Sequence, residues 1–186
     1  MQKKLLWPTP VYSFDLDMSE EDNQYLFSLL SSSIDNRYGA GVNVPELKDK
    51  VVQKLYNNIH EALNEAIYDV YPKKYEYMLT RGWASIQNPG ENLIVHGHGG
   101  IAFAAVYYVK TPPNSGDLLL LDQRGGVNWY NESNGLNSSV IYERITPKEN
   151  MLFVFPGFLL HEVETNKSSQ QRMCIANNII CKPKQG

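Results

Sequence analysis

Two hydrophobic periodicities divide the chain into a helical first part and a β-rich remainder. In the first part, apolar residues recur three or four positions apart, as they do on one face of a helix. One helix is predicted to begin after Ser19, which can cap it and is followed by three acidic residues. A second helix is predicted from about Pro45 to Tyr71, where Pro72 ends it. Its predicted apolar stripe comprises Leu47, Val51, Leu55, Ile59, Ala62, Ala66 and Val70.

From about Met78 the pattern changes to short apolar runs separated by clusters of Gly, Pro, Asn and Ser, which is typical of strands and turns. An earlier segment, Leu6–Phe14, is interrupted by two prolines and predicts an edge strand. The later runs predict strands at Leu79–Gln87, Leu93–His96, Ala102–Val109, Asp117–Asp122, Val140–Ile145, Met151–Phe155, Leu159–Val163 and Arg172–Cys181.

Many short strands of this kind predict a sandwich or a jelly-roll barrel. We therefore expect a mainly β protein with an N-terminal α region, in which two helices cover one outer face of the barrel. The length of 186 residues favours a single domain over residues 1–186. Within it, residues 1–77 are expected to form a helical support region and residues 78–181 the jelly-roll core.

Composition narrows the range of functions. The net charge of −3 gives no electrostatic reason to expect a nucleic acid or an anionic membrane as partner. No apolar stretch approaches the ~20 residues that cross a bilayer, and the N-terminus lacks the apolar core of a signal peptide. The two cysteines, Cys174 and Cys181, favour a reducing compartment without a disulfide framework. We expect a soluble cytoplasmic protein.

Three of the four histidines are placed where a metal site would need them. His96 and His98 lie two positions apart at the end of a predicted strand, so both side chains can point to one face. His161 follows the apolar run that ends at Pro156, and Arg172 begins the last predicted strand. Imidazole is the commonest ligand for divalent transition metals. The pattern indicates a metal centre with an anion-binding arginine beside it, whereas His60, on the second predicted helix, is assigned a structural role.

These motifs resemble the 2-oxoglutarate- and Fe(II)-dependent oxygenase superfamily, in particular its prolyl-hydroxylase-like phage and bacterial members. The resemblance extends over residues 83–180. It rests on His-Gly-His at 96–98, Tyr-Tyr-Val at 107–109, Gly-Asp-Leu-Leu-Leu at 116–120, Phe-Val-Phe-Pro at 153–156, the distal His161 and Arg172. It implies a double-stranded β-helix fold and an enzyme that uses Fe(II), 2-oxoglutarate and O₂, with ascorbate as a candidate reductant.

The resemblance also implies roles for individual residues. His96, His98 and His161 would be the catalytic metal ligands, and Arg172 with Tyr108 would bind 2-oxoglutarate. Pattern alone does not decide between Tyr107 and Tyr108, which point to opposite faces of a strand.

One residue departs from the family pattern, because position 98 is His where most members carry Asp or Glu. Either three imidazoles cap the metal, or His98 turns away and a nearby acid, Asp122 or Glu162, completes the set of ligands.

Three functions follow from this reading. The first is an oxygenase that hydroxylates an unknown substrate, either a peptide or protein or a small molecule. The second is a three-histidine cupin-type dioxygenase or isomerase that does not use 2-oxoglutarate. The third is a jelly roll without catalytic activity that serves assembly or recognition. A homodimer formed at the open edge of a sheet is compatible with each of them.

Overall fold

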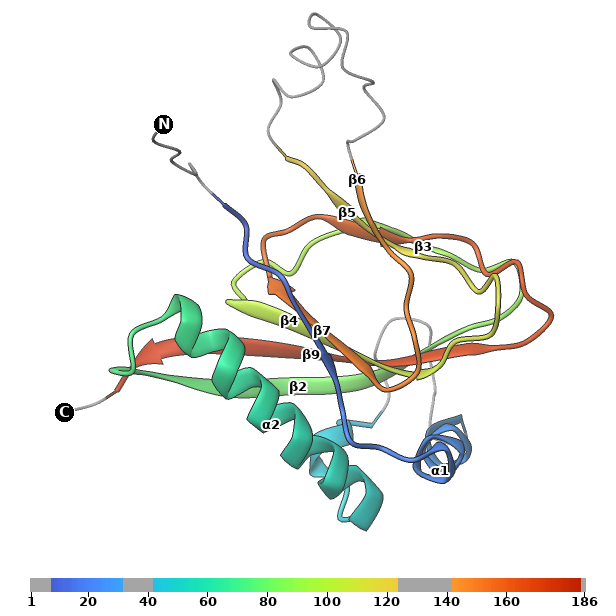
Figure 1. Cartoon of the computed structure of the whole chain (residues 1–186), viewed down its shortest axis with the longest axis horizontal. Helices are drawn as coiled ribbons and strands as arrows, with labels where there is room; N and C mark the ends of the chain where they lie inside the picture. The colour runs from blue at the N-terminus through green and yellow to red at the C-terminus, as the bar shows by residue number, and fades with distance from the viewer. Residues whose placement is uncertain (1–7, 32–41, 124–141, 185–186) are drawn as a thin grey trace, which may run out of the picture.

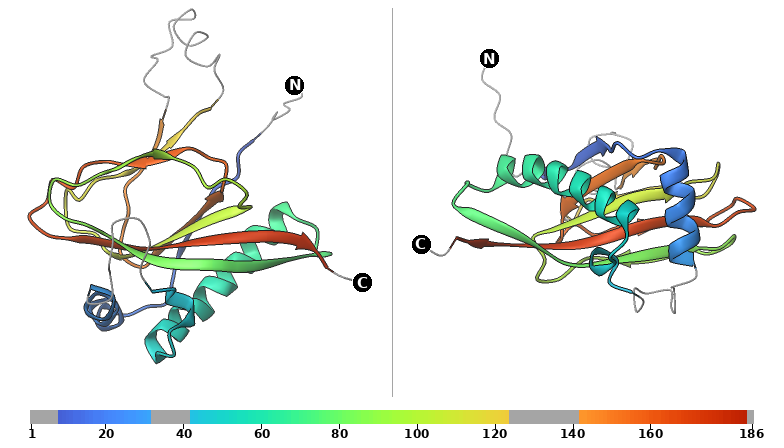
Figure 2. Two further views of the ribbon diagram at one scale, coloured as in Figure 1. Left: turned by 180° about the vertical axis from the view of Figure 1, so that it is seen from behind. Right: turned by 90° about the horizontal axis from the view of Figure 1, so that it is seen from below.

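The computed structural model describes residues 8–31, 42–123 and 142–184, and within these ranges the chain forms two antiparallel sheets with two helices. The larger sheet has the strand order β1-β7-β4-β9-β2 and the smaller has the order β3-β8-β5-β6. The two sheets lie face to face, and both helices cover the outer face of the larger sheet (Figures 1 and 2). This is the mainly β, jelly-roll-like architecture that the strand pattern predicted.

The N-terminal region contributes both helices and one strand. Strand β1 (Tyr12–Asp15) pairs with β7 at the edge of the larger sheet, which confirms the predicted edge strand. Helix α1 (Glu20–Ser31) begins where predicted, and Ser19 caps it by accepting a hydrogen bond from the Asp22 N–H at 3.1 Å. Pairing between two chains at the edge formed by β1 stays a prediction.

The predicted start of the second helix was wrong. Pro45 lies in a separate 3₁₀ turn, η1 (Val44–Glu46), and α2 (Lys50–Val70) begins only after Asp49. The Asp49 carboxylate accepts hydrogen bonds from the N–H groups of Val51 and Val52, which would otherwise lack partners.

The predicted stripe on α2 was partly wrong for the same reason. Leu47 precedes the helix, and Val70 at its end is 44% exposed. The buried face instead includes Val52, Leu55, Tyr56, Ile59, Ala62, Leu63, Ala66 and Ile67.

The predicted strands are present, and β3 has its predicted bounds, whereas the others have shifted ends. They are β2 (Tyr75–Gln87), β3 (Leu93–His96), β4 (Phe103–Lys110), β5 (Leu118–Leu121), β6 (Tyr142–Ile145), β7 (Met151–Pro156), β8 (His161–Val163) and β9 (Arg172–Pro183). The largest difference is at β2, which begins four residues earlier than predicted. It pairs with β9 along nearly its whole length, and both strands extend beyond the predicted apolar runs. The first two residues of the strand predicted at Val140–Ile145 lie outside the described residues.

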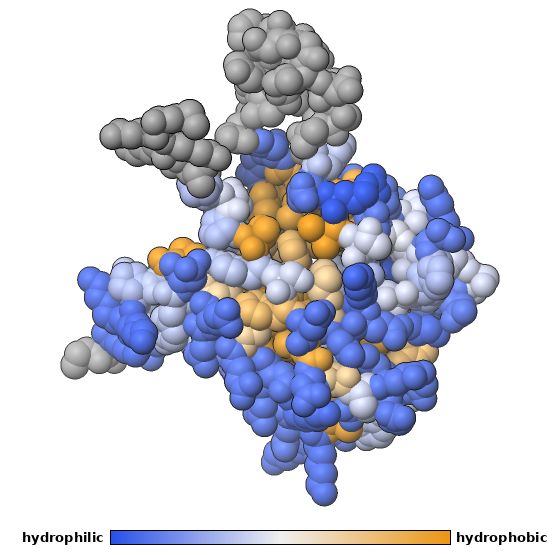
Figure 3. Space-filling view, in the orientation of Figure 1, coloured by the Kyte–Doolittle hydropathy of each residue, from blue (hydrophilic) through white to orange (hydrophobic). Residues whose placement is uncertain are grey.

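Alternation along the strands of the larger sheet produces two cores. One face packs against the helices and includes Tyr107, Leu152 and Ile175. The other face packs against the smaller sheet and includes Tyr108 and Phe153. Apolar residues are gathered between the two sheets on the face shown in Figure 3. Several residues on this inner face of β2 and β9, such as Ser85 and Cys174, remain partly exposed, so the space between the sheets is open to solvent there.

Candidate metal centre

Three histidines from two strands and one loop converge in the space between the sheets. His96 ends β3, His161 begins β8, and the two are directly opposed in the antiparallel pair, so both rings project to the same face. Their ring centroids are 4.2 Å apart, and the His98 ring lies 5.5 Å from His96 and 5.2 Å from His161. One ligand atom from each histidine lies within 4.8 Å of the others, so one ion could contact all three.

Backbone carbonyls orient two of the three rings. Nδ1 of His96 lies 2.9 Å from the Ile94 carbonyl oxygen, and Nδ1 of His161 lies 2.9 Å from that of Leu159. Because a carbonyl oxygen only accepts, each Nδ1 must carry the proton. Each Nε2 therefore keeps a free lone pair, as a metal ligand requires.

His98 reaches the cluster from a loop, not from the strand. Strand β3 ends at His96, so the expectation of two ligands on one strand was wrong for His98. Its position is instead fixed by its own N–H, which donates to the Gly157 carbonyl oxygen at 2.8 Å. This close approach of two loops requires glycine at position 157, because a Cβ there would lie 2.5 Å from the Ile101 oxygen. On its other side, the His98 ring contacts Trp83 with a centroid distance of 6.2 Å.

Burial favours the neutral form of two of the three histidines, His98 and His161. The His161 side chain is 4% exposed, and burial lowers its pKa to about 4, with smaller lowering effects from His96 and His98. Burial also lowers the pKa of His98, and the charge of His96 lowers it further, while the Asn178 side chain raises it. Neutral imidazoles are the ligand-competent form at physiological pH.

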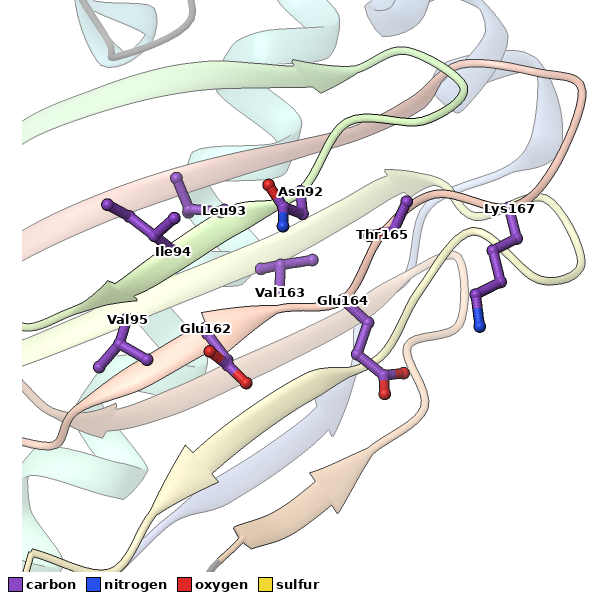
Figure 4. Close-up of a pocket in the computed structure, with 9 residues that line it drawn as sticks. All are labelled: Asn92, Leu93, Ile94, Val95, Glu162, Val163, Glu164, Thr165 and Lys167. Carbon is purple, nitrogen blue, oxygen red and sulfur yellow. The ribbon is translucent and has the colours of Figure 1, made fainter.

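Neither acid considered as a replacement for His98 belongs to the cluster. Asp122 and Glu162 are both described, and the group of ligand atoms that come together contains neither. Glu162 follows His161 on β8 and so projects to the opposite face of the sheet. There it lines a groove of about 640 Å³ along β3 and β8 that contains none of the three histidines (Figure 4). His60, in turn, lies outside the cluster and interacts with Tyr77 on β2 at 3.1 Å.

Arg172 and Tyr108 lie together on the inner face of the larger sheet. Both are buried, at 2% and 0% exposed, and the guanidinium carbon lies 5.3 Å from the centroid of the Tyr108 ring. Arg172 donates one hydrogen bond, from Nη1 to the Gly116 oxygen at 3.2 Å, and forms no ion pair with a carboxylate of the described residues. The Arg172 Nε and the Tyr108 hydroxyl have no hydrogen-bond partner. Burial raises the pKa of Tyr108, so its hydroxyl keeps its proton and can donate.

The neighbouring Tyr107 is excluded from this site, because its hydroxyl faces the helices and donates to Asn23 Oδ1 at 2.7 Å. Gln87 is buried, is the cross-strand partner of Arg172, and its Nε2 has no hydrogen-bond partner among the described residues. Trp83 contacts His98. Pattern alone could not identify these two positions, because their orientation follows from the register of β2 against β9.

The sequence profile of one protein family, described as "Putative 2OG-Fe(II) oxygenase", matches residues 81–178. The chain belongs to this family. It is therefore a 2-oxoglutarate- and Fe(II)-dependent oxygenase, an enzyme class that uses O₂ as its oxidant. The matched region runs from β2 to β9 and includes all three clustered histidines, Tyr108 and Arg172.

Solved structures of similar fold include several oxygenases. A prolyl-4-hydroxylase from Pseudomonas putida aligns with a TM-score of 0.62 at 13% identity, covering 95% of this chain and 88% of that one. HygX from Streptomyces hygroscopicus, solved with nickel and 2-oxoglutarate bound, gives 0.63 at 14% identity, covering 92% and 81%. The viral collagen prolyl hydroxylase of Paramecium bursaria Chlorella virus-1, in its 2-oxoglutarate complex, gives 0.58 at 14%, covering 91% and 94%. At identities this low, the structural likeness shows that the oxygenase shares the fold of these proteins and no more.

No functionally curated protein matches the sequence of this oxygenase. Among its described residues, no helix is long and apolar enough to span a membrane.

Proposed function

We propose that this oxygenase is a hydroxylase built on a double-stranded β-helix, in which His96, His98 and His161 bind Fe(II) and Arg172 and Tyr108 bind 2-oxoglutarate. The observation that carries the proposal is the buried arginine, which has no anionic partner among the described residues and faces the same inter-sheet space as the histidine cluster. A buried charge without a partner is costly, so Arg172 is best explained by an anion that binds there.

The donor set fits a divalent iron ion. Three neutral imidazoles, two of them oriented by Nδ1 hydrogen bonds, would cap one side of the ion and leave positions on the other side open. Bound Fe(II) would supply the site for O₂ and for the oxidative decarboxylation of 2-oxoglutarate to succinate and CO₂. With imidazole at position 98 in place of a carboxylate, the protein ligands bring no negative charge, so the ion with the same anionic co-substrate would keep one more unit of positive charge here than in a two-histidine, one-carboxylate site.

The far carboxylate of 2-oxoglutarate would lie over the inner face of the larger sheet, against Tyr108 of β4 and Arg172 of β9. The planar guanidinium of Arg172 can grip a carboxylate through two parallel hydrogen bonds, and its Nε–H has no other partner. The Tyr108 hydroxyl would donate a third bond. The Gln87 amide, across the strand pair from Arg172, offers a further donor on the opposite side. Burial of these groups excludes competing water and strengthens each bond.

The primary substrate would approach from the side of His98, where the Trp83 ring remains partly exposed. The fold likeness to two prolyl hydroxylases favours a peptide or protein over a small molecule as the substrate. A proline or another aliphatic C–H bond held near the open side of the ion would be the position that is hydroxylated.

The metal assignment is tested by anaerobic titration with Fe(II). His161→Ala should abolish stoichiometric binding, whereas His60→Ala, which changes a histidine remote from the cluster, should retain it. Full Fe(II) stoichiometry in His161→Ala would show that the ligands are wrongly named.

The second candidate function is a three-histidine dioxygenase that binds its substrate directly to iron. It is favoured because, within residues 8–31, 42–123 and 142–184, no carboxylate joins the cluster. Calorimetric titration of the metal-loaded protein with 2-oxoglutarate separates the two. The proposal predicts saturable heat below millimolar ligand, followed by succinate and CO₂ when O₂ is admitted. No heat at millimolar 2-oxoglutarate would favour the second candidate.

A further inference from the structure

The three clustered histidines differ in how their Nδ1 atoms are held. His96 and His161 each donate Nδ1–H to a carbonyl two residues earlier in the chain. Among the described contacts, His98 makes no such bond, because its hydrogen bonds to the backbone use its own main-chain N–H and carbonyl oxygen and not its ring. A histidine that binds a metal through Nε2 must carry its proton on Nδ1, and that proton needs an acceptor.

Asn178 carries an acceptor in the right place. It lies on β9 with the same alternation as Arg172, so its side chain also faces the space between the sheets. Its cross-strand partners are Arg81 on β2 and Ala104 on β4. Trp83 lies two residues after Arg81 on β2, and its ring contacts the His98 ring.

The Asn178 Oδ1 atom is buried and makes no hydrogen bond of good geometry, although the side chain interacts with the His98 ring. A buried amide oxygen without a donor is unfavourable, and few are found in folded proteins. The neighbouring Asn177 shows the contrast: it faces the helices, and its Oδ1 accepts from the Tyr56 hydroxyl at 2.8 Å.

We propose that Asn178 is a positioning residue for His98, whose Nδ1–H it accepts when Nε2 binds the metal. This inference rests on the proposed function of the three histidines as ligands. It assigns two tasks to strand β9, because Arg172 at its start binds the co-substrate and Asn178 near its end orients the ligand that departs from the family pattern.

The test uses Co(II), a redox-inert probe whose visible absorption reports ligand geometry. Asn178→Ala should weaken Co(II) binding by roughly 10- to 100-fold and alter the absorption spectrum, as expected when the partner of a metal-bound histidine is lost. Asn178→Asp should restore both, because a carboxylate accepts the same proton. Asn177→Ala is the matched control. It should reduce thermal stability but leave the Co(II) spectrum unchanged.

A second measurement separates positioning from general packing. In the His98→Asp background there is no Nδ1–H to accept, so the added change Asn178→Ala should cost no further Co(II) affinity. If Asn178→Ala costs the same in both backgrounds, or changes neither affinity nor spectrum, the proposal is overturned.

Failure of the proposed function would give a different result from failure of the inference about Asn178. Wild-type protein that binds no stoichiometric metal refutes the function itself. Long-range ¹⁵N–¹H spectra of the metal-free protein then still test the contact. They should show the Nδ1–H form of His98 in the wild type and a mixture of both forms in Asn178→Ala, and unchanged spectra would overturn the inference about Asn178.

Discussion

Replacing Arg172 with methionine should change stability and co-substrate binding in opposite directions. The side chain is 2% exposed, has no carboxylate partner among the described residues, and makes one hydrogen bond to the protein. Without ligand, its buried charge is a cost to the folded state. With 2-oxoglutarate bound, the same charge becomes the main source of affinity for the far carboxylate.

The magnitudes follow from these contacts. An unpaired buried charge costs the folded state several kcal/mol. Two contacts of Arg172 offset part of this cost. The cation–π contact with Tyr108 contributes about 2 kcal/mol, and the hydrogen bond to the Gly116 oxygen contributes about 1.5 kcal/mol. Methionine should therefore stabilise the ligand-free protein by about 1–2 kcal/mol, which raises the melting temperature by roughly 2–8 °C. Losing two charge-assisted bonds costs about 3 kcal/mol or more in binding, which is roughly a 100-fold increase in the Kd for 2-oxoglutarate.

Thermal unfolding of the metal-free protein followed by circular dichroism gives the first quantity, and calorimetric titration of the Ni(II)-loaded protein with 2-oxoglutarate gives the second. Arg144→Met is the matched control, because Arg144 is 53% exposed and pairs with Asp117 and Glu164 at the surface. It should alter neither quantity appreciably. A less stable Arg172→Met that binds 2-oxoglutarate as tightly as the wild type would refute the reasoning and make Arg172 a structural cation.

Three further predictions concern Tyr108, His161 and Asp49. Tyr108→Phe should raise the Kd for 2-oxoglutarate about 10-fold in the same titration without loss of thermal stability, because the hydroxyl has no protein partner to lose. His161 binds its proton less readily in the folded state, with a pKa of about 4 against 6.5. Stability of the metal-free protein should therefore fall by roughly 3 kcal/mol as pH drops from 6.5 to 4. Urea unfolding across this range should show the decline, and His161→Leu should make it clearly smaller, although His98, whose pKa burial also lowers, still contributes to it. Asp49→Ala should lower the unfolding free energy by about 1 kcal/mol in urea, since two N–H groups of α2 lose their acceptor.

The order and type of the elements could be read from the sequence because they depend on local periodicity. The apolar run Leu93–Val95 placed β3 at its observed bounds, and the acids after Ser19 marked the start of α1. The start of α2 could not be read in the same way. Pro45 suits the first turn of an α-helix and of a 3₁₀ turn equally, so only the capping contacts of Asp49 show which of them it begins.

In the candidate site, too, some residues could be identified from the sequence and others depend on how the strands pair. Residue type and order were enough to pick out the three histidines and Arg172, because imidazole and guanidinium have specific uses. Which of Tyr107 and Tyr108 faces the site depends on the strand's orientation between two cores, and both faces of β4 are apolar. Gln87 is similar, since its burial beside Arg172 follows from pairing between β2 and β9.

His98 connects the departure seen in the sequence with a feature seen only in three dimensions. A carboxylate ligand brings its own charge and has no ring proton to place, so Asp at this position would need no acceptor opposite it. An imidazole brings no charge and must place a proton on Nδ1. His98 lies in a loop that is held by the hydrogen bond from its main-chain N–H to the Gly157 oxygen. Among the described contacts, no backbone oxygen accepts a hydrogen bond from the His98 ring, in contrast to the rings of His96 and His161. Substituting His for Asp therefore creates a need for a side-chain acceptor on the facing sheet, and the unpartnered oxygen of Asn178 lies beside the ring that requires it.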